Sequence, residues 1–290
     1  MSISAVIPVK NRPALIVQAI GSCLAQSRAP DEIIVVDDGS DDTTPDIVKD
    51  LAEKESRIKL IRRENSGGAA LARNLGAAQA EGRWLAFLDS DDRWHNDKLE
   101  SQLALARQFP DAPAIFCGIR YAYATRKARI GIPKPVVGHA DLTVSNVLAS
   151  TSAAFVRKDK FQEVLGFDAA LPNCEDWDLW LKLAKLGPLP VVQAPLVEYS
   201  FEATNKLSRD VSKLLRGHEL VFARIAAECG SGRLSALHDL KRAELHIRVT
   251  GEVMKALRFI TSAVRQSPSG DVLRRSLHLM GLMTVHGARL

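Results

Sequence analysis

Short apolar runs alternate with longer amphipathic stretches over the first two thirds of the chain. The runs that predict buried strands cover residues 3–9, 32–36, 58–61, 84–88, 114–118, 152–156 and 190–197. Helical spacing of apolar side chains begins near residues 13, 44, 69, 94 and 176, and residues 126–141, rich in Gly, Pro and Lys, predict a loop. Strands separated by helices indicate βαβ units, so we expect an α/β fold with a mostly parallel sheet.

Polar clusters follow three of the predicted strands. They are Lys10-Asn11, Asp37-Asp38 and Asp89-Ser90-Asp91-Asp92. Ligands of open α/β sheets bind at the carboxyl ends of the strands, so these clusters predict one shared site.

Three acids within four residues repel one another unless a cation or hydrogen-bond donors lie beside them. Carboxylate oxygens suit Mg²⁺ or Mn²⁺, which keep water and substrate phosphates as further ligands. A solvated turn that caps the next helix is the alternative interpretation. The sequence has neither GxxxxGK[ST] nor a GxGxxG after its first strand, which argues against P-loop and dinucleotide folds. Two acidic clusters at one sheet edge favour a nucleotide diphosphate and a metal ion.

The composition is that of an ordinary globular protein, with 46% hydrophobic and 25% charged residues in a chain of 290. Four scattered cysteines form no CxxC pair, and no signal-like segment opens the sequence, so we expect reduced thiols and a cytoplasmic location. From Phe201 onward, 15 Lys and Arg face 8 Asp and Glu. No nucleic-acid-binding motif accompanies this charge, and we expect no nucleic acid partner.

Residues 208–290 predict helices alone, with breaks at 230–232 and 267–270. One predicted apolar stripe comprises Val272, Leu273, Leu277, Met280 and Met283, with Arg274, Arg275 and Arg289 nearby. Three interpretations stay open. These helices pack on the rest of the chain, form a homodimer contact, or touch the anionic inner face of a membrane.

Several ordered motifs together resemble glycosyltransferase family 2. They are Ala5–Pro13, Gln26-Ser27, Ile34–Thr43, Gly68, Ala72–Gly76, Gly82–Asp92, Gly166–Asp168 and Glu175–Leu183. The resemblance is dense from residue 3 to about residue 110. It implies a GT-A fold, with domain 1–207 divided into a nucleotide-sugar half (1–110) and an acceptor half (111–207), followed by a basic helical region, 208–290.

The resemblance also implies an inverting, metal-dependent transfer from a nucleotide-diphosphate sugar, with UDP as the expected nucleotide, to a saccharide or lipid-linked acceptor. Such a reaction serves cell-surface polysaccharide or glycolipid synthesis. Asp176 is the implied general base, and Asp89 and Asp92 are the implied ligands of Mn²⁺ or Mg²⁺ at a DxD-type motif. The residues implied for donor binding are Pro8, Val9, Asn11, Asp38, Arg73, Asn74 and Asp91.

The sequence departs from the family after its last predicted strand. Many relatives carry a Tyr-Arg pair and a His in a loop that closes over the diphosphate, whereas Tyr199–Ser208 contains neither Arg nor His. A nucleotide-sugar binding protein without catalysis is therefore one alternative. A sugar-phosphate nucleotidyltransferase is another, although the glycine- and Arg/Lys-rich loop expected of that class after the first strand is missing.

Overall fold

The computed structural model describes residues 1–123, 127–200, 210–230 and 232–287. The chain divides into two compact units. One comprises Met1–His139, Val147–Ala170 and Glu175–Thr204, and the other Ala140–Asn146, Leu171–Cys174 and Asn205–Leu290. The sequence-based boundary after residue 207 lies outside the described residues and stays a prediction.

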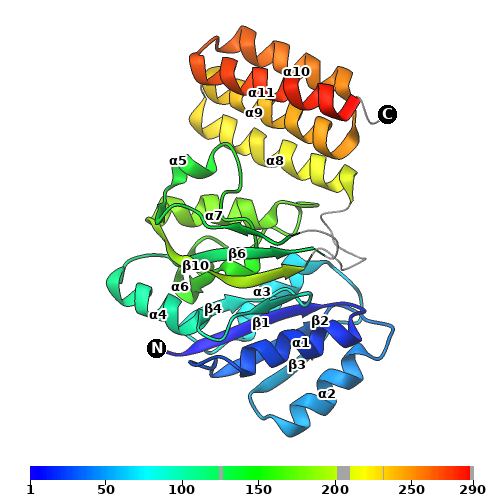
Figure 1. Ribbon diagram of the computed structural model, residues 1–290. Helices are drawn as coiled ribbons and strands as arrows, with labels where there is room; N and C mark the ends of the chain where they lie inside the picture. Colours follow the sequence, from blue (N-terminus) through cyan, green and yellow to red (C-terminus); the bar gives the residue numbers. More distant parts are fainter. Residues whose placement is uncertain (124–126, 201–209, 231, 288–290) are drawn as a thin grey trace. The chain divides into compact units, whose positions relative to one another are not determined.

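The first unit is built on a mixed sheet (Figure 1). Strands β3 (Ile58–Arg62), β2 (Glu32–Asp37), β1 (Ile3–Val9) and β4 (Trp84–Phe87) pair in parallel in that order. Next come β9 (Phe155–Arg157), antiparallel to both neighbours, then β6 (Ala114–Ala122), β10 (Leu189–Ser200) and β5 (Asp92–Trp94). The α/β class is confirmed: the first four strands are parallel to one another, and β6 and β10 form a second parallel pair.

Two local expectations are wrong. The strand expected at 152–156 begins only at Phe155, because Thr151–Ala153 forms a short 3₁₀ helix, η1. The segment expected as a loop contains strands β7 (Arg129–Gly131) and β8 (Val136–Val137) and the short helix α5 (His139–Leu142). Both strands are short and pair at their edges with β6 and β10, and that pairing leaves little trace in the local pattern.

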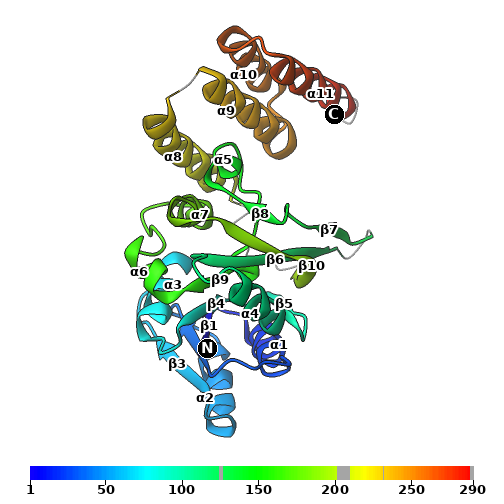
Figure 2. The same cartoon turned by 90° about the vertical axis from the view of Figure 1, so that its left-hand side faces the viewer.

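Helices cover both faces of the sheet (Figure 2). Helices α1 (Pro13–Leu24), α2 (Thr44–Lys54) and α4 (Lys98–Gln108) bury apolar side chains in one cluster with Ile3, Ala5, Ile7 and Val9 of β1. On the other face lie α3 (Ala69–Gln79), α6 (Lys158–Glu163) and α7 (Glu175–Leu186). There Phe87 of β4 packs on Phe161 of α6, and Phe116 of β6 meets Trp180 of α7 edge-on.

Helix α3 approaches β1 closely because it carries Gly76. A Cβ atom added there would lie 2.5 Å from Cγ1 of Val6, so a larger residue would push the helix away from the strand. This close packing determines how close Arg73, one turn earlier on the same helix, lies to the sheet.

The second unit is helical, as expected. It contains α8 (Val211–Cys229), α9 (Gly232–Leu245), a π-helical turn (His246–Thr250), α10 (Val253–Gln266) and α11 (Gly270–Gly287). The predicted breaks at 230–232 and 267–270 are confirmed. The predicted single stripe on α11 is wrong: Val272 and Met283 are buried against α9 and α10, whereas Leu273, Leu277 and Met280 are exposed. Arg289 lies outside the described residues.

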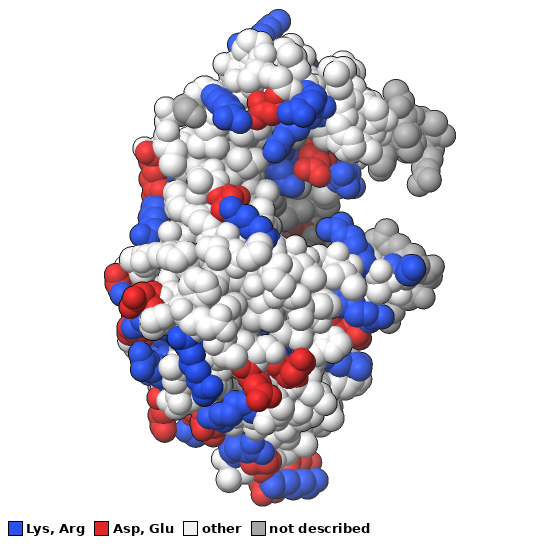
Figure 3. Space-filling model, turned by 60° about the vertical axis from the view of Figure 1, so that its left-hand side comes forward, with Lys and Arg blue, Asp and Glu red and all other residues white. Residues whose placement is uncertain are grey.

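Surface charge and cysteine state agree with the composition. On the face shown in Figure 3, acidic and basic side chains are interspersed over the sheet-bearing unit. All four cysteines are free thiols. Among the described residues, no helix is both long and apolar enough to cross a bilayer.

Candidate functional site

The carboxyl end of β1 is tied to the turn that follows β2. The Asn11 backbone N–H donates to Oγ of Ser40 at 2.9 Å, and the Asn11 side-chain oxygen accepts from the N–H of Asp41 at 3.1 Å. Asn11 has a φ of 52°, a left-handed conformation that Asn adopts more readily than most residues. Pro8 and Val9 lie buried at the end of the strand. The Asp38 backbone N–H donates to the Val9 carbonyl at 2.8 Å, so the end of β1 lies directly beside Asp38.

Asp38 is enclosed by the loop between β3 and α3. Its carboxylate accepts from Oγ of Ser66 at 2.7 Å and from the backbone N–H of Gly68 at 2.8 Å, and it also pairs with Arg63. Gly68 has a φ of 90°, which lets its N–H turn toward the carboxylate at the start of α3. With 4% of its surface exposed, Asp38 is held in place as a hydrogen-bond acceptor at the edge of the sheet.

The acidic turn after β4 is held from beneath by η1. Oγ of Ser152 donates to Oδ2 of Asp92 at 2.6 Å and accepts from the backbone N–H of Asp89 at 3.1 Å. Oγ1 of Thr151 donates to Oδ2 of Asp89 at 3.0 Å. One buried hydroxyl therefore connects the first and last acids of the turn.

Ser152 and the residues that support it carry no signal in the sequence. The Ser152 carbonyl accepts from Nε1 of Trp94 at 3.0 Å, and the Gln102 amide donates to the next carbonyl, that of Ala153, at 2.9 Å. Gln102 also accepts from Nζ of Lys98, a fully buried lysine whose ammonium lies over the Trp94 ring. Burial lowers the pKa of Lys98 to about 8. No spacing rule marks these residues, because they meet only through α4, β5 and η1.

The middle acid of the turn faces the loop after β1. A guanidinium nitrogen of Arg12 lies 2.9 Å from Oδ1 of Asp91 and donates to Oγ of Ser90 at 3.2 Å. Arg12 directly follows Asn11, so neighbouring residues contact the Asp38 turn and the acidic turn. The two predicted acidic clusters therefore converge at one end of the parallel strands.

Arg73 of α3 connects the acidic turn to the start of α7. Its guanidinium donates to Asp89 at 2.6 Å and to Glu175 at 2.9 Å, and the side chain is 6% exposed. Desolvation would lower the pKa of Arg73, but the charges of Asp89 and Glu175 outweigh it and hold the pKa above its ordinary value. A buried arginine shared by two carboxylates fixes both elements in one geometry.

The charges of this cluster act on Asp176, which is next to Glu175. Although part of its surface remains accessible, desolvation raises its pKa to about 7, and the charges of Glu175 and Asp89 act in the same direction. Arg73 and the N–H of Trp177, 2.7 Å from Oδ1, act in the opposite direction but are weaker. A carboxylate with this pKa exchanges its proton near neutral pH. Trp177 itself is 1% exposed and belongs to the core.

Asn74 has a different role in the geometry from its neighbour Arg73. Its amide donates to the Phe167 carbonyl at 2.8 Å and accepts from the Phe167 N–H at 3.0 Å. It thereby fastens α3 to the turn before α7, and its predicted place in donor binding stays a prediction.

The carboxylates of the acidic turn are the candidate ligands of a metal ion. Among the described residues, no three His, Cys, Asp or Glu side chains are arranged to hold an ion by themselves. Asp89 keeps 25% of its side chain exposed, whereas Asp92 is 1% exposed. This donor set fits a hard cation that is bound by one or two carboxylates together with substrate phosphates.

Comparison with known proteins decides the family. The family model described as Glycosyl transferase family 2 matches residues 4–165. The chain belongs to this family. Residues of the family match thus include every predicted site residue except Asp176.

Three relatives illustrate the similarity. The chain is 34% identical over 190 residues, 64% of its length and 73% of the other, to TuaG of Bacillus subtilis, whose name assigns it provisionally to teichuronic acid biosynthesis. It is 44% identical over 103 residues, 36% of its length and 40% of the other, to the Escherichia coli glucosyltransferase WfgD. In fold it is similar to S. aureus TarS 1–349 with UDP-GlcNAc, with a TM-score of 0.68, 18% identity and coverage of 99% of this chain and 89% of that one. The expected GT-A fold is confirmed.

From residue 201 onward, the segment in which the family's Arg and His are missing lies outside the described residues, so this departure is an observation on the sequence.

Proposed function

We propose that this glycosyltransferase moves a sugar, with inversion, from a nucleotide-diphosphate donor, with UDP as the expected nucleotide, to a hydroxyl of a saccharide or lipid-linked acceptor. The names of two relatives support this class. WfgD is named as using UDP-Glc and a diphosphoundecaprenol-linked acceptor, and TuaG is named for teichuronic acid biosynthesis. A role in cell-surface polysaccharide synthesis follows from both names.

The observation that carries the proposal is the cluster of Asp176, Glu175, Arg73 and Asp89. In a single displacement the acceptor oxygen attacks the anomeric carbon while the bond from that carbon to the diphosphate oxygen breaks. The acceptor proton then needs one base, and Asp176, with its pKa near neutrality, fits that need. Arg73 and Glu175 orient the start of α7 so that this carboxylate lies beside the acidic turn.

The donor would lie along the ends of β1, β2 and β4. Asp38 would accept from a base N–H, with Pro8, Val9 and Asn11 beside the nucleoside, and Asp91 would face the ribose or sugar. Asp89 and Asp92 would hold Mn²⁺ or Mg²⁺ together with the diphosphate, and a bound divalent cation stabilises the charge of the departing diphosphate. A cytoplasmic location and a homodimer through the helical region stay predictions.

Transfer and binding should be measured on matched carboxyl-to-amide variants. Asp176→Asn should bind UDP in the presence of Mn²⁺ as tightly as the parent but lose at least about a hundredfold in transfer or donor hydrolysis. Asp50→Asn, an exposed acid on α2, should behave as the parent. Binding of UDP without any turnover in the parent protein would favour the binding-protein alternative. Unchanged turnover in Asp176→Asn would remove the base assignment.

A further inference from the structure

Two exposed arginines lie on the outer face of α10. Arg258 and Arg265 are exposed, and neither makes an ion pair or hydrogen bond with any described residue. Elsewhere in the helical unit, Arg242 contacts Glu219 and Asp239, and Arg233 contacts Asp271. Arg216 of α8 and Arg275 of α11 are exposed and make no ion pair with any described residue. The outer face of α10 therefore presents two uncompensated charges on one helix, and the neighbouring helix α11 adds a third.

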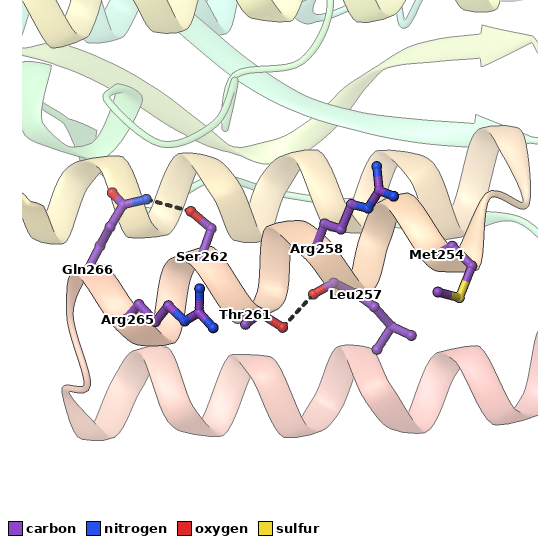
Figure 4. A pocket seen from close by; sticks show the side chains of 7 residues that line it. All are labelled: Met254, Leu257, Arg258, Thr261, Ser262, Arg265 and Gln266. Carbon is purple, nitrogen blue, oxygen red and sulfur yellow. Dashed lines mark hydrogen bonds between the residues drawn. The ribbon is translucent and has the colours of Figure 1, made fainter.

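The same face is hollowed into a groove of about 540 Å³ (Figure 4). Its lining residues are Met254, Leu257, Arg258, Thr261, Ser262, Arg265 and Gln266. Arg258 and Arg265 are seven residues apart and so lie on one side of the helix, two turns from each other. Met254, at the end of the groove, is 70% exposed. Cations, hydroxyls and an apolar end within one groove fit a phosphate-bearing amphiphile.

The neighbouring helix strengthens this pattern. Leu273, Leu277 and Met280 are spaced by four and three residues on α11 and are 41%, 68% and 39% exposed. Across α10 and α11 the sequence has five Lys and Arg against one acid, Asp271, and that acid contacts Arg233. Exposed large apolar side chains on a basic helix pair are typical of helices that lie in a membrane interface.

We propose that the outer face of α10, defined by Met254, Leu257, Arg258, Thr261 and Arg265, together with exposed Leu277 of α11, docks on an anionic lipid bilayer. Headgroup phosphates would receive the two arginines, and Met254 and Leu277 would enter the acyl boundary. A symmetric contact with a second copy fits less well. It would place the arginines of one α10 against those of the other, with no acid on that helix to separate them. This docking does not depend on the sugar-transfer proposal.

Vesicle sedimentation of the full chain tests the surface. Vesicles with about a third phosphatidylglycerol are compared with pure phosphatidylcholine at moderate salt. Each Lys or Arg near an anionic surface contributes about fivefold to partitioning, so Arg258→Gln/Arg265→Gln should bind about 30-fold more weakly. Lys49→Gln/Arg107→Gln removes two exposed, unpaired cations from α2 and α4 and should bind within about twofold of the parent. Met254→Ser/Leu277→Ser should lose about tenfold or more with its net charge unchanged.

Every outcome decides for or against the docking surface. All replaced side chains are exposed, so the thermal midpoints of the variants should match that of the parent. If Met254→Ser/Leu277→Ser has a lowered midpoint, vesicle binding is measured on the single variant Met254→Ser. Equal binding of the parent to both vesicle types, no binding to either, or equal loss in the two cation pairs would overturn the proposal. So would a parent dimer in size-exclusion runs that Arg258→Gln/Arg265→Gln converts to a monomer while vesicle binding is unchanged. UDP binding, measured alongside, reports the nucleotide site separately.

Discussion

Replacing Glu175 by Gln should move the acid limb of the transfer rate to lower pH. In the parent protein, the pKa of Asp176 is raised to about 7 by desolvation first and by the charge of Glu175 second. At pH 6 only about a tenth of Asp176 then carries the charge needed to accept a proton, and at pH 8 about nine tenths does. The rate constant kcat/KM should therefore fall about tenfold for each pH unit below 6.

The amide variant removes one negative charge and leaves Arg73 with a single carboxylate partner. Both changes favour ionised Asp176. One charge in a partly buried site is worth about one pH unit, so the rate at pH 6 should rise from about a tenth to about a half of its plateau. The assay is kcat/KM for donor consumption between pH 5 and 9 at fixed Mn²⁺. Glu53→Gln, an exposed acid on α2, serves as the control and should leave the limb in place. A limb that stays put or moves upward in Glu175→Gln would refute the electrostatic reasoning.

Three further outcomes follow from the site. Arg73→Gln should move the same limb to higher pH and lower the free energy of unfolding by about 3 kcal/mol, because two carboxylates lose a buried partner. The pH profile and urea denaturation measure the two effects, and an unchanged limb would contradict the assignment. Ser152→Ala should lower the free energy of unfolding by about 1–2 kcal/mol in urea denaturation and weaken UDP binding, since buried Asp92 loses its 2.6 Å donor. Ser150→Ala, whose hydroxyl lies 3.5 Å from Asp92, should cost less, and equal losses would argue against the role of Ser152. Chelation of divalent cations should weaken UDP binding in calorimetry, and Asp89→Asn should make binding insensitive to the chelator; tight binding by the chelated parent would remove the metal.

The fold was largely predictable because each strand and helix between β1 and β4 shows the hydrophobic period of its own type and ends at a polar turn. Apolar runs such as Ile3–Val9 and Trp84–Leu88 have strand length, and the acids that follow them mark the sheet edge. The remaining elements depend on partners distant in sequence. Strand β5 begins at Asp92, inside the acidic motif, and exists because Asp92–Trp94 pairs with Val197–Tyr199 of β10.

In the candidate site, too, the residues marked by the sequence differ from the contacts that only tertiary packing creates. Residue types and spacing marked Asp38, Asp89, Asp91 and Asp92, and the resemblance to the family marked Asp176. They could not mark the contacts that hold these acids, because Ser152 and Arg12 reach Asp92 and Asp91 across 60 and 79 residues of sequence, and Arg73 reaches Glu175, next to Asp176, across 102. Those contacts depend on tertiary packing, including the approach of α3 to β1 at Gly76.

At the start of α7, the sizes of two opposing effects on the pKa of Asp176 distinguish a helix-capping carboxylate from a general base. A helix N-terminus stabilises a carboxylate by about 0.3–1 kcal/mol, which lowers its pKa by less than one unit. If capping governed Asp176, its pKa would lie below its ordinary value, and protonation near neutral pH would not occur. Burial disfavours the charged form by far more than the helix terminus favours it, and Glu175 adds to the same side. The Trp177 N–H contact persists at 2.7 Å, so Asp176 does bond the helix start, yet the balance leaves it proton-binding at neutral pH. Its folded-state pKa is raised, so ionised Asp176 costs stability as pH rises from about 4 to about 7, and Asp176→Asn should gain thermal stability at pH 8 but not at pH 4.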